Sequence, residues 1–340
     1  MPTELRSAAI VGIGSCLPER VVSNAELEQI VDTSDEWIRS RTGICERRIV
    51  DSTKAASDLA VQASLAALAM AGLPAAAVDL IIVATITPDN IFPATASRVQ
   101  ERLGARKAAA FDISAGCTGF VYALGVASQF IATGLYNNAL VIGSEVLSKF
   151  VNWQDRKTCV LFGDGAGAVV LKAVPAGEGL LGLHLGSDGS GADYLAIPAG
   201  VSRLPASNST VQRQLHTVHM NGPEVFKFAV RIMGEASLKV LKKAGLNKED
   251  IDFLVPHQAN SRIIDAATKR LGLEPEKVYI NLERYGNMSA ASIPVALEEV
   301  YLAGKLKVGD IVLLVAFGAG LTWGAAVLKW VLDVPEEGAS

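Results

Sequence analysis

The chain has 340 residues, of which 50% are hydrophobic and 19% are charged. This composition is typical of a well-packed globular protein with room for two domains, and it excludes an intrinsically disordered chain. The formal net charge of −4 gives no electrostatic support to a nucleic-acid function, so we expect no nucleic-acid partner.

The first predicted element is a strand near the N-terminus, around residues 10–13. The residues before it lack the charged start, apolar stretch and cleavage site of a signal peptide. No apolar run along the chain approaches the ~18 residues expected of a membrane span. The four cysteines form neither a CxxC pair nor a zinc-ligand cluster, and so few in a long chain favour a reducing compartment. We therefore expect a cytoplasmic protein that holds no metal and does not associate with membranes.

Strands and helices alternate along the rest of the chain. Continuous apolar runs predict strands over residues 80–84, 139–142 and 311–316, and helices are predicted over residues 54–71, 118–133, 223–244, 261–271 and 289–303. Because these strands are apolar on both faces, they predict α/β sheets covered by helices on both sides. The Gly-, Ser- and Pro-rich stretch 187–221 is predicted to be a long connecting loop.

The chain also repeats itself. Ala71-Gly72-Leu73 precedes the strand at 80–83 at the same spacing at which Ala244-Gly245-Leu246 precedes an apolar run at 253–255. Four further pairs follow in the same order, at residues 10–13 and 180–183, 116–117 and 286–287, 139–143 and 311–315, and 167–172 and 324–329. The sequence therefore predicts a duplicated α/β unit, with halves at 1–175 and 176–340 packed face to face. A site is expected where the strand ends of the two halves converge.

Cys117 lies in the predicted turn between a strand at 108–113 and a helix that begins near Thr118. Unpaired N–H groups and the positive end of a helix dipole favour a thiolate at such a position. Gly116 and Gly119 allow a tight turn and the close approach of a substrate. A buried cysteine is otherwise a small hydrophobic residue, and that is our interpretation of the other three cysteines.

His257 and Asn287 complete a candidate catalytic set. His257 follows a predicted strand at 251–256, and Asn287 occupies the second-half position that corresponds to Cys117. Each has an ordinary structural alternative, as a hydrogen-bonded strand-end residue and as a helix cap. The duplication, however, predicts that Cys117 and Asn287 face each other with His257 nearby. Cysteine, histidine and asparagine in one cavity suit nucleophilic acyl chemistry.

Six motifs surround these residues. They are DEWIRSRTGI at 35–44, SAGCTGF at 114–120, FGDGAG at 162–167, PHQAN at 256–260, YGN at 285–287 and FGAG at 317–320. Together they resemble the signature of the ketoacyl synthase III family over nearly the whole chain. The resemblance implies a thiolase-like fold, in which the duplicated halves form a layered α-β-α-β-α core. Two departures are an alanine, Ala319, where some members carry a third glycine, and Pro223 where relatives can offer a polar side chain.

The resemblance implies a decarboxylating condensation that starts fatty acid biosynthesis. An acyl-coenzyme A primer acylates Cys117, with the backbone N–H groups of Cys117 and Ala319 as the oxyanion hole. Malonyl-(acyl carrier protein) then loses carbon dioxide while His257 and Asn287 donate hydrogen bonds to the developing enolate. The carbanion attacks the acyl-cysteine and releases 3-oxoacyl-(acyl carrier protein). No metal or redox cofactor is implied, and coenzyme A enters as part of a substrate.

The resemblance also implies the substrate-binding residues. Trp37 and Arg156 would flank the adenine of coenzyme A, Arg41 and Arg262 would neutralise its phosphates, and Asn260 would hydrogen-bond the pantetheine arm.

Protein partners are implied in the same way. A basic patch for the acidic carrier protein would comprise Lys227, Arg262, Lys269 and Arg270, for which a solvated helix face is the alternative. Phe92 would reach the acyl pocket of a partner subunit, which implies a homodimer.

Several other functions share parts of this pattern. A condensing-fold acyltransferase or a starter synthase of a secondary-metabolite pathway could keep all three catalytic residues. A type III polyketide synthase also uses cysteine, histidine and asparagine, but Trp37 and Arg41 argue against it. Hydroxymethylglutaryl-coenzyme A synthases need a glutamate base, and none occupies the three motif positions. A catalytically inactive partner subunit is disfavoured by the intact set.

Overall fold

The apolar runs of the first half form a five-stranded sheet in the computed structural model, which describes residues 6–333. Its order is β1 (Arg6–Cys16), β7 (Asp164–Pro175), β6 (Asn138–Val146), β4 (Leu80–Ala84) and β5 (Ala109–Ile113). β4 runs parallel to β5 and β6, whereas β7 is antiparallel to β6 and β1. Every residue of β6 is buried, as expected of a strand covered on both faces.

The second sheet repeats this arrangement. Its order is β11 (Phe253–Pro256), β12 (Ile311–Gly318), β13 (Thr322–Lys329) and β8 (Gly179–Ser187), with β11 parallel to β12 and the other neighbours antiparallel. The counterpart of β5 is a single parallel bridge between Leu254 and Val278. The predicted duplication of the fold is therefore confirmed. The boundary near residue 175 stays a prediction, and residues 1–5 and 334–340 of the two halves lie outside the described residues.

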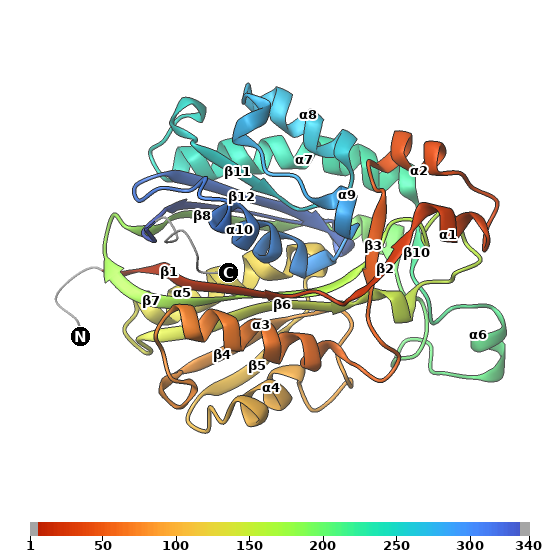
Figure 1. The fold of residues 1–340 in the computed structure, drawn as a ribbon, viewed down its shortest axis with the longest axis horizontal. Coiled ribbons are helices and arrows are strands. Elements are labelled where there is room, and N and C mark those ends of the chain that lie inside the picture. Colours follow the sequence, from red (N-terminus) through yellow and green to blue (C-terminus); the bar gives the residue numbers. More distant parts are fainter. Residues whose placement is uncertain (1–5, 334–340) are drawn as a thin grey trace.

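Helices lie in three layers around the two sheets (Figure 1). α3 (Ala56–Met70) and α4 (Thr95–Leu103) cover the outer face of the first sheet, α7 (Gly222–Lys243) and α8 (Ser261–Leu271) cover that of the second, and α5 (Gly119–Ala132) and α10 (Ser292–Leu302) lie between the sheets. The predicted α-β-α-β-α core is confirmed. The observed helices agree with the predicted ranges to within one turn at each end.

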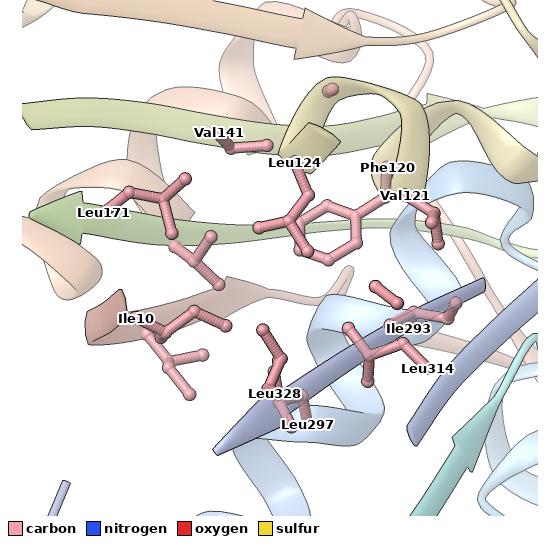
Figure 2. Close-up of a cluster of buried hydrophobic side chains, with 14 of the residues drawn as sticks. Ile10, Phe120, Val121, Leu124, Val141, Leu171, Ile293, Leu297, Leu314 and Leu328 are labelled. Atoms are coloured by element: carbon pink, nitrogen blue, oxygen red, sulfur yellow. The ribbon is translucent and has the colours of Figure 1, made fainter. Parts of the chain in front are cut away.

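The middle layer holds the central core. Side chains of α5 and α10 interdigitate with those of both sheets (Figure 2). The labelled members are Ile10, Phe120, Val121, Leu124, Val141, Leu171, Ile293, Leu297, Leu314 and Leu328. Burying each side chain of this size contributes ~1.5–3 kcal/mol. The core therefore fixes α5 and α10, and with them the turns that precede the two helices.

A smaller layer covers one end of the sheets. It contains β2 (Arg20–Ser23), α1 (Asn24–Glu28), α2 (Asp35–Thr42), β3 (Glu46–Ile49) and α9 (Leu282–Tyr285). A separate apolar cluster joins these elements to α8 and to the segment around residue 160. This layer positions Trp37 and Arg41, which lie on α2.

The stretch 187–221 connects β8 to α7, as predicted, but it is not a loop throughout. It contains a 3₁₀ helix (Gly189–Tyr194), α6 (Asn208–Gln212) and the paired short strands β9 (Leu195–Ala196) and β10 (His219–Met220). α6 is stabilised locally, because the Ser207 hydroxyl accepts a hydrogen bond from the Thr210 amide. Elements this short carry no measurable periodicity in a sequence. No helix within residues 6–333 has the length and apolar character needed to cross a membrane.

Candidate active site

Cys117 lies in one 3₁₀ turn (Gly116–Thr118) that follows β5 and leads into α5. Gly116 has a φ of +57°, a conformation that favours glycine. The Thr118 hydroxyl donates to Thr322 Oγ1 at 2.9 Å, which joins this turn to the second half of the chain. The Cys117 side chain is 6% exposed. The thiol is therefore held at the start of α5, as the sequence predicts.

Asn287 lies in the equivalent turn ahead of α10. Its N–H donates to Leu161 O at 2.8 Å and its C=O accepts from the Gly163 amide at 3.0 Å. The side-chain Oδ1 accepts from the Ser289 amide at 2.8 Å. That contact uses the oxygen of the amide and leaves the NH₂ group of Asn287 as the donor on the side of Cys117, whose pKa it lowers.

His257 directly follows β11, and its N–H donates to Val315 O at 2.8 Å. The ring meets Phe317 edge-on, with 5.5 Å between centroids. The side chain is 1% exposed, and among residues 6–333 neither ring nitrogen finds a hydrogen-bond partner. Burial lowers the pKa of His257 to about 3. The imidazole is therefore neutral, and its N–H is available to a group that enters the cavity.

Two cavities meet at Cys117. The smaller, about 520 Å³, is also lined by His257 and Asn287 and extends to Trp37 and Arg41. The larger, about 780 Å³, extends past Ile86 and Ile91. A thiol at this junction can carry a group in one cavity while a second molecule arrives through the other.

Burial controls the protonation of Cys117. It raises the pKa of the thiol to about 12, although polar contacts from Ser289 and Asn287 lower the pKa in part. The carboxylate of Glu145 raises it further. The sequence-based expectation that the helix N-terminus alone favours the thiolate is therefore incomplete, because burial outweighs it. The thiol is protonated in the free protein and must lose its proton when it reacts.

The backbone groups assigned to the oxyanion hole lie in two touching turns. A Cβ added to Gly116 would lie 2.9 Å from the Ala319 amide nitrogen. A Cβ added to Gly318 would lie 2.6 Å from the amide nitrogen of Cys117. Only glycine allows this approach, so Gly116 and Gly318 let the backbone around Cys117 lie against the backbone around Ala319.

Gly318→Ala should therefore destabilise the protein and misplace the thiol. The added methyl must displace the Cys117 backbone, and overpacking of this kind costs ~1–3 kcal/mol. Urea unfolding measures the loss of stability, and the rate of Cys117 alkylation by iodoacetamide reports the displacement. Gly189→Ala is the matched control, because a Cβ at Gly189 would meet no atom within 4 Å. Equal stability of the two variants would contradict this account of the turn.

Trp37 lines the smaller cavity, and Arg156, which is far from it in sequence and does not line the cavity, lies over its ring. The Arg156 guanidinium stands 5.1 Å from the centre of the Trp37 ring. Its Nη1 donates to Asp32 O at 2.7 Å, which holds the side chain in place. A cation and an aromatic ring in this arrangement can hold a flat aromatic group.

Asn260 caps α8 and joins the other predicted binding residues. Its Oδ1 accepts from the Arg262 amide at 3.0 Å, and its NH₂ donates to Arg41 O at 2.9 Å. Both ends of the Asn260 amide are thus engaged within the protein. The Arg262 guanidinium lies 5.2 Å from the ring centre of Phe226. Asn260, Arg262 and Arg41 all line the smaller cavity.

The four predicted carrier-binding residues lie on two adjacent outer helices. Lys227 belongs to α7, and Arg262, Lys269 and Arg270 belong to α8; all four are exposed. Arg270 pairs with Glu235 at 3.8 Å.

Phe92, which was predicted to reach the acyl pocket of a partner subunit, is 84% exposed and contributes to the lining of neither cavity within the described chain.

Sequence reasoning missed four residues of the site. Lys157 and Phe226 line the smaller cavity, and Ser289 lines the larger one with Glu145 behind it. Glu145 carried a signal in the sequence, because it is the one charged residue of the fully buried strand β6. Ser289 lies two residues after Asn287, inside the helix start that the motif predicts.

Two family models match the chain. One, described as 3-oxoacyl-[acyl-carrier-protein (ACP)] synthase III, matches residues 111–189, and the other, described as the C-terminal part of that synthase, matches residues 241–330. Beta-ketoacyl-[acyl-carrier-protein] synthase III of Caldanaerobacter subterraneus subsp. tengcongensis is 60% identical over 324 residues, which are 95% of this chain and 98% of that protein.

Solved structures are similar as well. 3-Oxoacyl-[acyl-carrier-protein] synthase III from Aquifex aeolicus VF5 is 47% identical with a TM-score of 0.88, over 95% of this chain and 100% of that one. The priming β-ketosynthase of the R1128 polyketide biosynthetic pathway is 35% identical with a TM-score of 0.89, over 98% and 99% of the two chains.

Proposed function

Because the chain belongs to the 3-oxoacyl-(acyl carrier protein) synthase III family, we propose that it condenses an acyl-coenzyme A primer with malonyl-(acyl carrier protein) and so initiates fatty acid synthesis. It is an acyltransferase, and acyl-coenzyme A is a substrate rather than a resident cofactor. One observation carries the proposal. Cys117, His257 and Asn287 line one cavity, and the thiol stands where that cavity meets a second one.

The first half-reaction transfers the acyl group. The Cys117 sulfur attacks the thioester carbonyl, the bond from that carbon to the coenzyme A sulfur breaks, and the released thiolate takes a proton from solvent. The Cys117 and Ala319 amides would hold the oxyanion, which a preorganised donor stabilises by ~3–4 kcal/mol. The acyl chain then occupies the larger cavity, while the smaller one is free for the second substrate.

The second half-reaction forms the carbon–carbon bond. Malonyl-(acyl carrier protein) enters the smaller cavity and loses carbon dioxide, which leaves an enolate on the thioester oxygen. The N–H of neutral His257 and the NH₂ of Asn287 would donate to that oxygen. Asparagine cannot remove a proton from carbon, so the pair suits decarboxylation better than aldol-type condensation. The enolate carbon then attacks the acyl-cysteine carbonyl and expels the Cys117 thiolate.

Substrate and carrier would bind at the mouth of the smaller cavity. Trp37 and Arg156 would hold the adenine, while Arg41 and Arg262 would face the phosphates of coenzyme A. The acidic carrier protein would dock on α7 and α8, through Lys227, Arg262, Lys269 and Arg270. The exposure of the four carrier-binding cations and the position of Arg262 in the lining of the cavity support this assignment.

The protein is proposed to act as a homodimer in the cytoplasm. Ile91 and Phe92 are 75% and 84% exposed, and Ile91 lies at the open side of the larger cavity. Adjacent exposed apolar side chains at the edge of a cavity are typical of an interface. A second copy of the chain would cover them and close the acyl cavity, with Phe92 reaching the partner subunit.

Product analysis tests the function. The protein is incubated with a panel of acyl-coenzyme A thioesters, and intact mass reports the acyl adduct. Malonyl-(acyl carrier protein) is then added, and mass spectrometry of the carrier identifies the product. We expect one adduct that malonyl-(acyl carrier protein) discharges to a 3-oxoacyl product. Acylation without carbon–carbon bond formation would instead favour an acyltransferase.

Removal of the adenine platform has a separate expected result. Trp37→Ala should raise KM for acyl-coenzyme A roughly 5- to 10-fold and leave kcat within about twofold, since the ring contributes equally to ground-state and transition-state binding. Steady-state kinetics measures both constants. Arg39→Ala, on the same helix but paired with Asp35, is the matched control. An acyl-pantetheine substrate lacks adenine, so Trp37→Ala and Arg39→Ala should have the same KM for it. A higher KM of Trp37→Ala for this substrate would mean that Trp37 does not act through the adenine.

The secondary-metabolite alternative receives less support. The R1128 priming β-ketosynthase shares 35% identity with this chain, compared with 60% for the synthase III of C. subterraneus. All the catalytic residues would be retained in either case. The carrier protein that discharges the acyl-enzyme therefore separates the two pathways.

A further inference from the structure

Glu145 is a fully buried carboxylate near the nucleophile. It lies at the end of β6 and is 0% exposed. Its oxygens accept hydrogen bonds from Thr87 Oγ1 at 2.6 Å, from the Ile86 amide at 3.2 Å and from Thr85 Oγ1 at 3.3 Å. These contacts are hydroxyls and one amide rather than a cation. A buried carboxylate held in this way is costly to stability and is often functional.

The 3₁₀ turn that begins at Ser289 (Ser289–Ala291) packs against both the turn that holds Cys117 and strand β6, which carries Glu145. The Ser289 side chain is 1% exposed and its hydroxyl makes no hydrogen bond of ordinary length within the described chain. Ser289 lines the larger cavity together with Cys117, and its hydroxyl lowers the pKa of both Cys117 and Glu145. Ser289 has a φ of +48°, a strained conformation for a residue with a side chain, and the Asn287 side chain holds its amide. Such strain persists where the surroundings impose it, commonly at functional sites.

We propose that Glu145 accepts the proton of Cys117 through the hydroxyl of Ser289 when the thiol attacks the acyl thioester. Ser289 passes its hydroxyl proton to the Glu145 carboxylate and takes the proton from the Cys117 sulfur. The sulfur then bonds to the acyl carbon. After condensation, the expelled Cys117 thiolate recovers the proton by the reverse path. Glu145 and Ser289 are therefore positioning residues for the thiol, and the inference rests on the proposed function.

The surroundings of Glu145 favour this carboxylate over His257 as the acceptor of the Cys117 proton. The groups that act on Glu145 are the hydroxyls of Thr87, Ser289 and Thr85 and one backbone amide, and burial raises the pKa of its carboxyl to about 7. The Glu145 carboxylate acts in turn on the Cys117 thiol, whose pKa it raises.

Neighbouring elements offer no closer competitor. On β7 the residue opposite Glu145 is Gly165, and the next, Asp164, is held by Ser148 and the Val50 amide. His257, with its pKa near 3, is a poor proton acceptor at neutral pH.

Thiol alkylation tests the proposal without any acyl substrate. In the wild type, the rate of Cys117 alkylation by iodoacetamide should rise through pH 7 and then level. Glu145→Gln should lose this inflection and react at least about 10-fold more slowly near pH 8. If Glu145 acted only by charge repulsion, the same substitution would lower the pKa of Cys117 and speed alkylation. Faster or unchanged alkylation would therefore overturn the proposal.

Half-reactions separate this role from a structural one. Glu145→Gln and Ser289→Ala should each slow Cys117 acylation about 100-fold, a usual size for a lost proton acceptor, and the double variant should be no slower than either. Decarboxylation of malonyl-(acyl carrier protein) should stay within about threefold, and Glu145→Asp should restore part of the acylation rate. Equal loss of both half-reactions would indicate a folding defect and refute the relay.

A matched control and the wild type complete the test. Glu298, on α10, is another carboxyl with a raised pKa, and it accepts a hydrogen bond from the Ser15 amide of β1. Glu298→Gln should leave both half-reactions intact. If the wild type accepts no acyl group but its alkylation profile follows Glu145 as described, the proposed function fails and the relay stands.

Discussion

Cys117→Ala is expected to abolish the acyl adduct and to slow condensation by roughly 10⁴-fold or more, the usual cost of removing a covalent nucleophile. The alanine methyl fills most of the space of the side chain, so the fold should persist. No other thiol stands at the junction of the two cavities within the described chain. Intact mass after incubation with acyl-coenzyme A, together with product formation, measures both effects.

Two further variants sharpen this expectation. Cys117→Ser should also fail to accumulate an adduct, because a buried hydroxyl is a far weaker acid than a thiol. Cys16→Ser is the control, since Cys16 is a half-buried free cysteine outside both cavities. Cys117→Ala should still decarboxylate malonyl-(acyl carrier protein), because the imidazole of His257 and the amide of Asn287 remain. An adduct on Cys117→Ala would refute the nucleophile assignment.

Much of the fold could be predicted from the sequence. Its strands are continuous apolar runs, and its helices end at a glycine or where apolar residues give way to polar ones. The repeat predicted more than the elements. It placed Asn287 opposite Cys117, since equivalent turns of two packed halves face one another. The short elements between residues 187 and 221 could not be predicted in the same way, because they depend on local caps and on pairing between distant residues.

The chemistry of the site was only partly visible in the sequence. Thiolate stabilisation at a helix N-terminus follows from local order, but the burial that raises the pKa of Cys117 is a property of the assembled core. The Cys117–Ser289–Glu145 arrangement likewise joins three distant segments. Arg156 could be placed over Trp37 only through the resemblance, because 119 positions separate them and no periodicity relates them.

His257→Ala and Asn287→Ala should each slow decarboxylation of malonyl-(acyl carrier protein) roughly 10²- to 10³-fold, the usual cost of one lost donor to a developing oxyanion. Cys117 acylation should fall by less than about 10-fold, since neither donor contacts the first oxyanion. Because both donors are proposed to hold the same oxygen, the double variant should lose less than the product of the single effects. Carbon dioxide release and adduct formation measure the two half-reactions.

Asn287→Asp separates the role of Asn287 as an N–H donor to the enolate from its structural hydrogen bond to the Ser289 amide. The carboxylate can keep the hydrogen bond to the Ser289 amide, but it has no N–H and repels the enolate. It should therefore decarboxylate at least as poorly as Asn287→Ala.

Burial sets the pH dependence of His257: with a folded pKa of about 3, the imidazole is neutral and keeps one N–H at every higher pH, and it gains a second proton and a positive charge only as pH falls through that value. Decarboxylation should thus show no inflection near pH 6.5. Such an inflection in the wild type that disappears in His257→Ala would mean that the imidazole is solvated during turnover, and the neutral-donor mechanism would then be wrong.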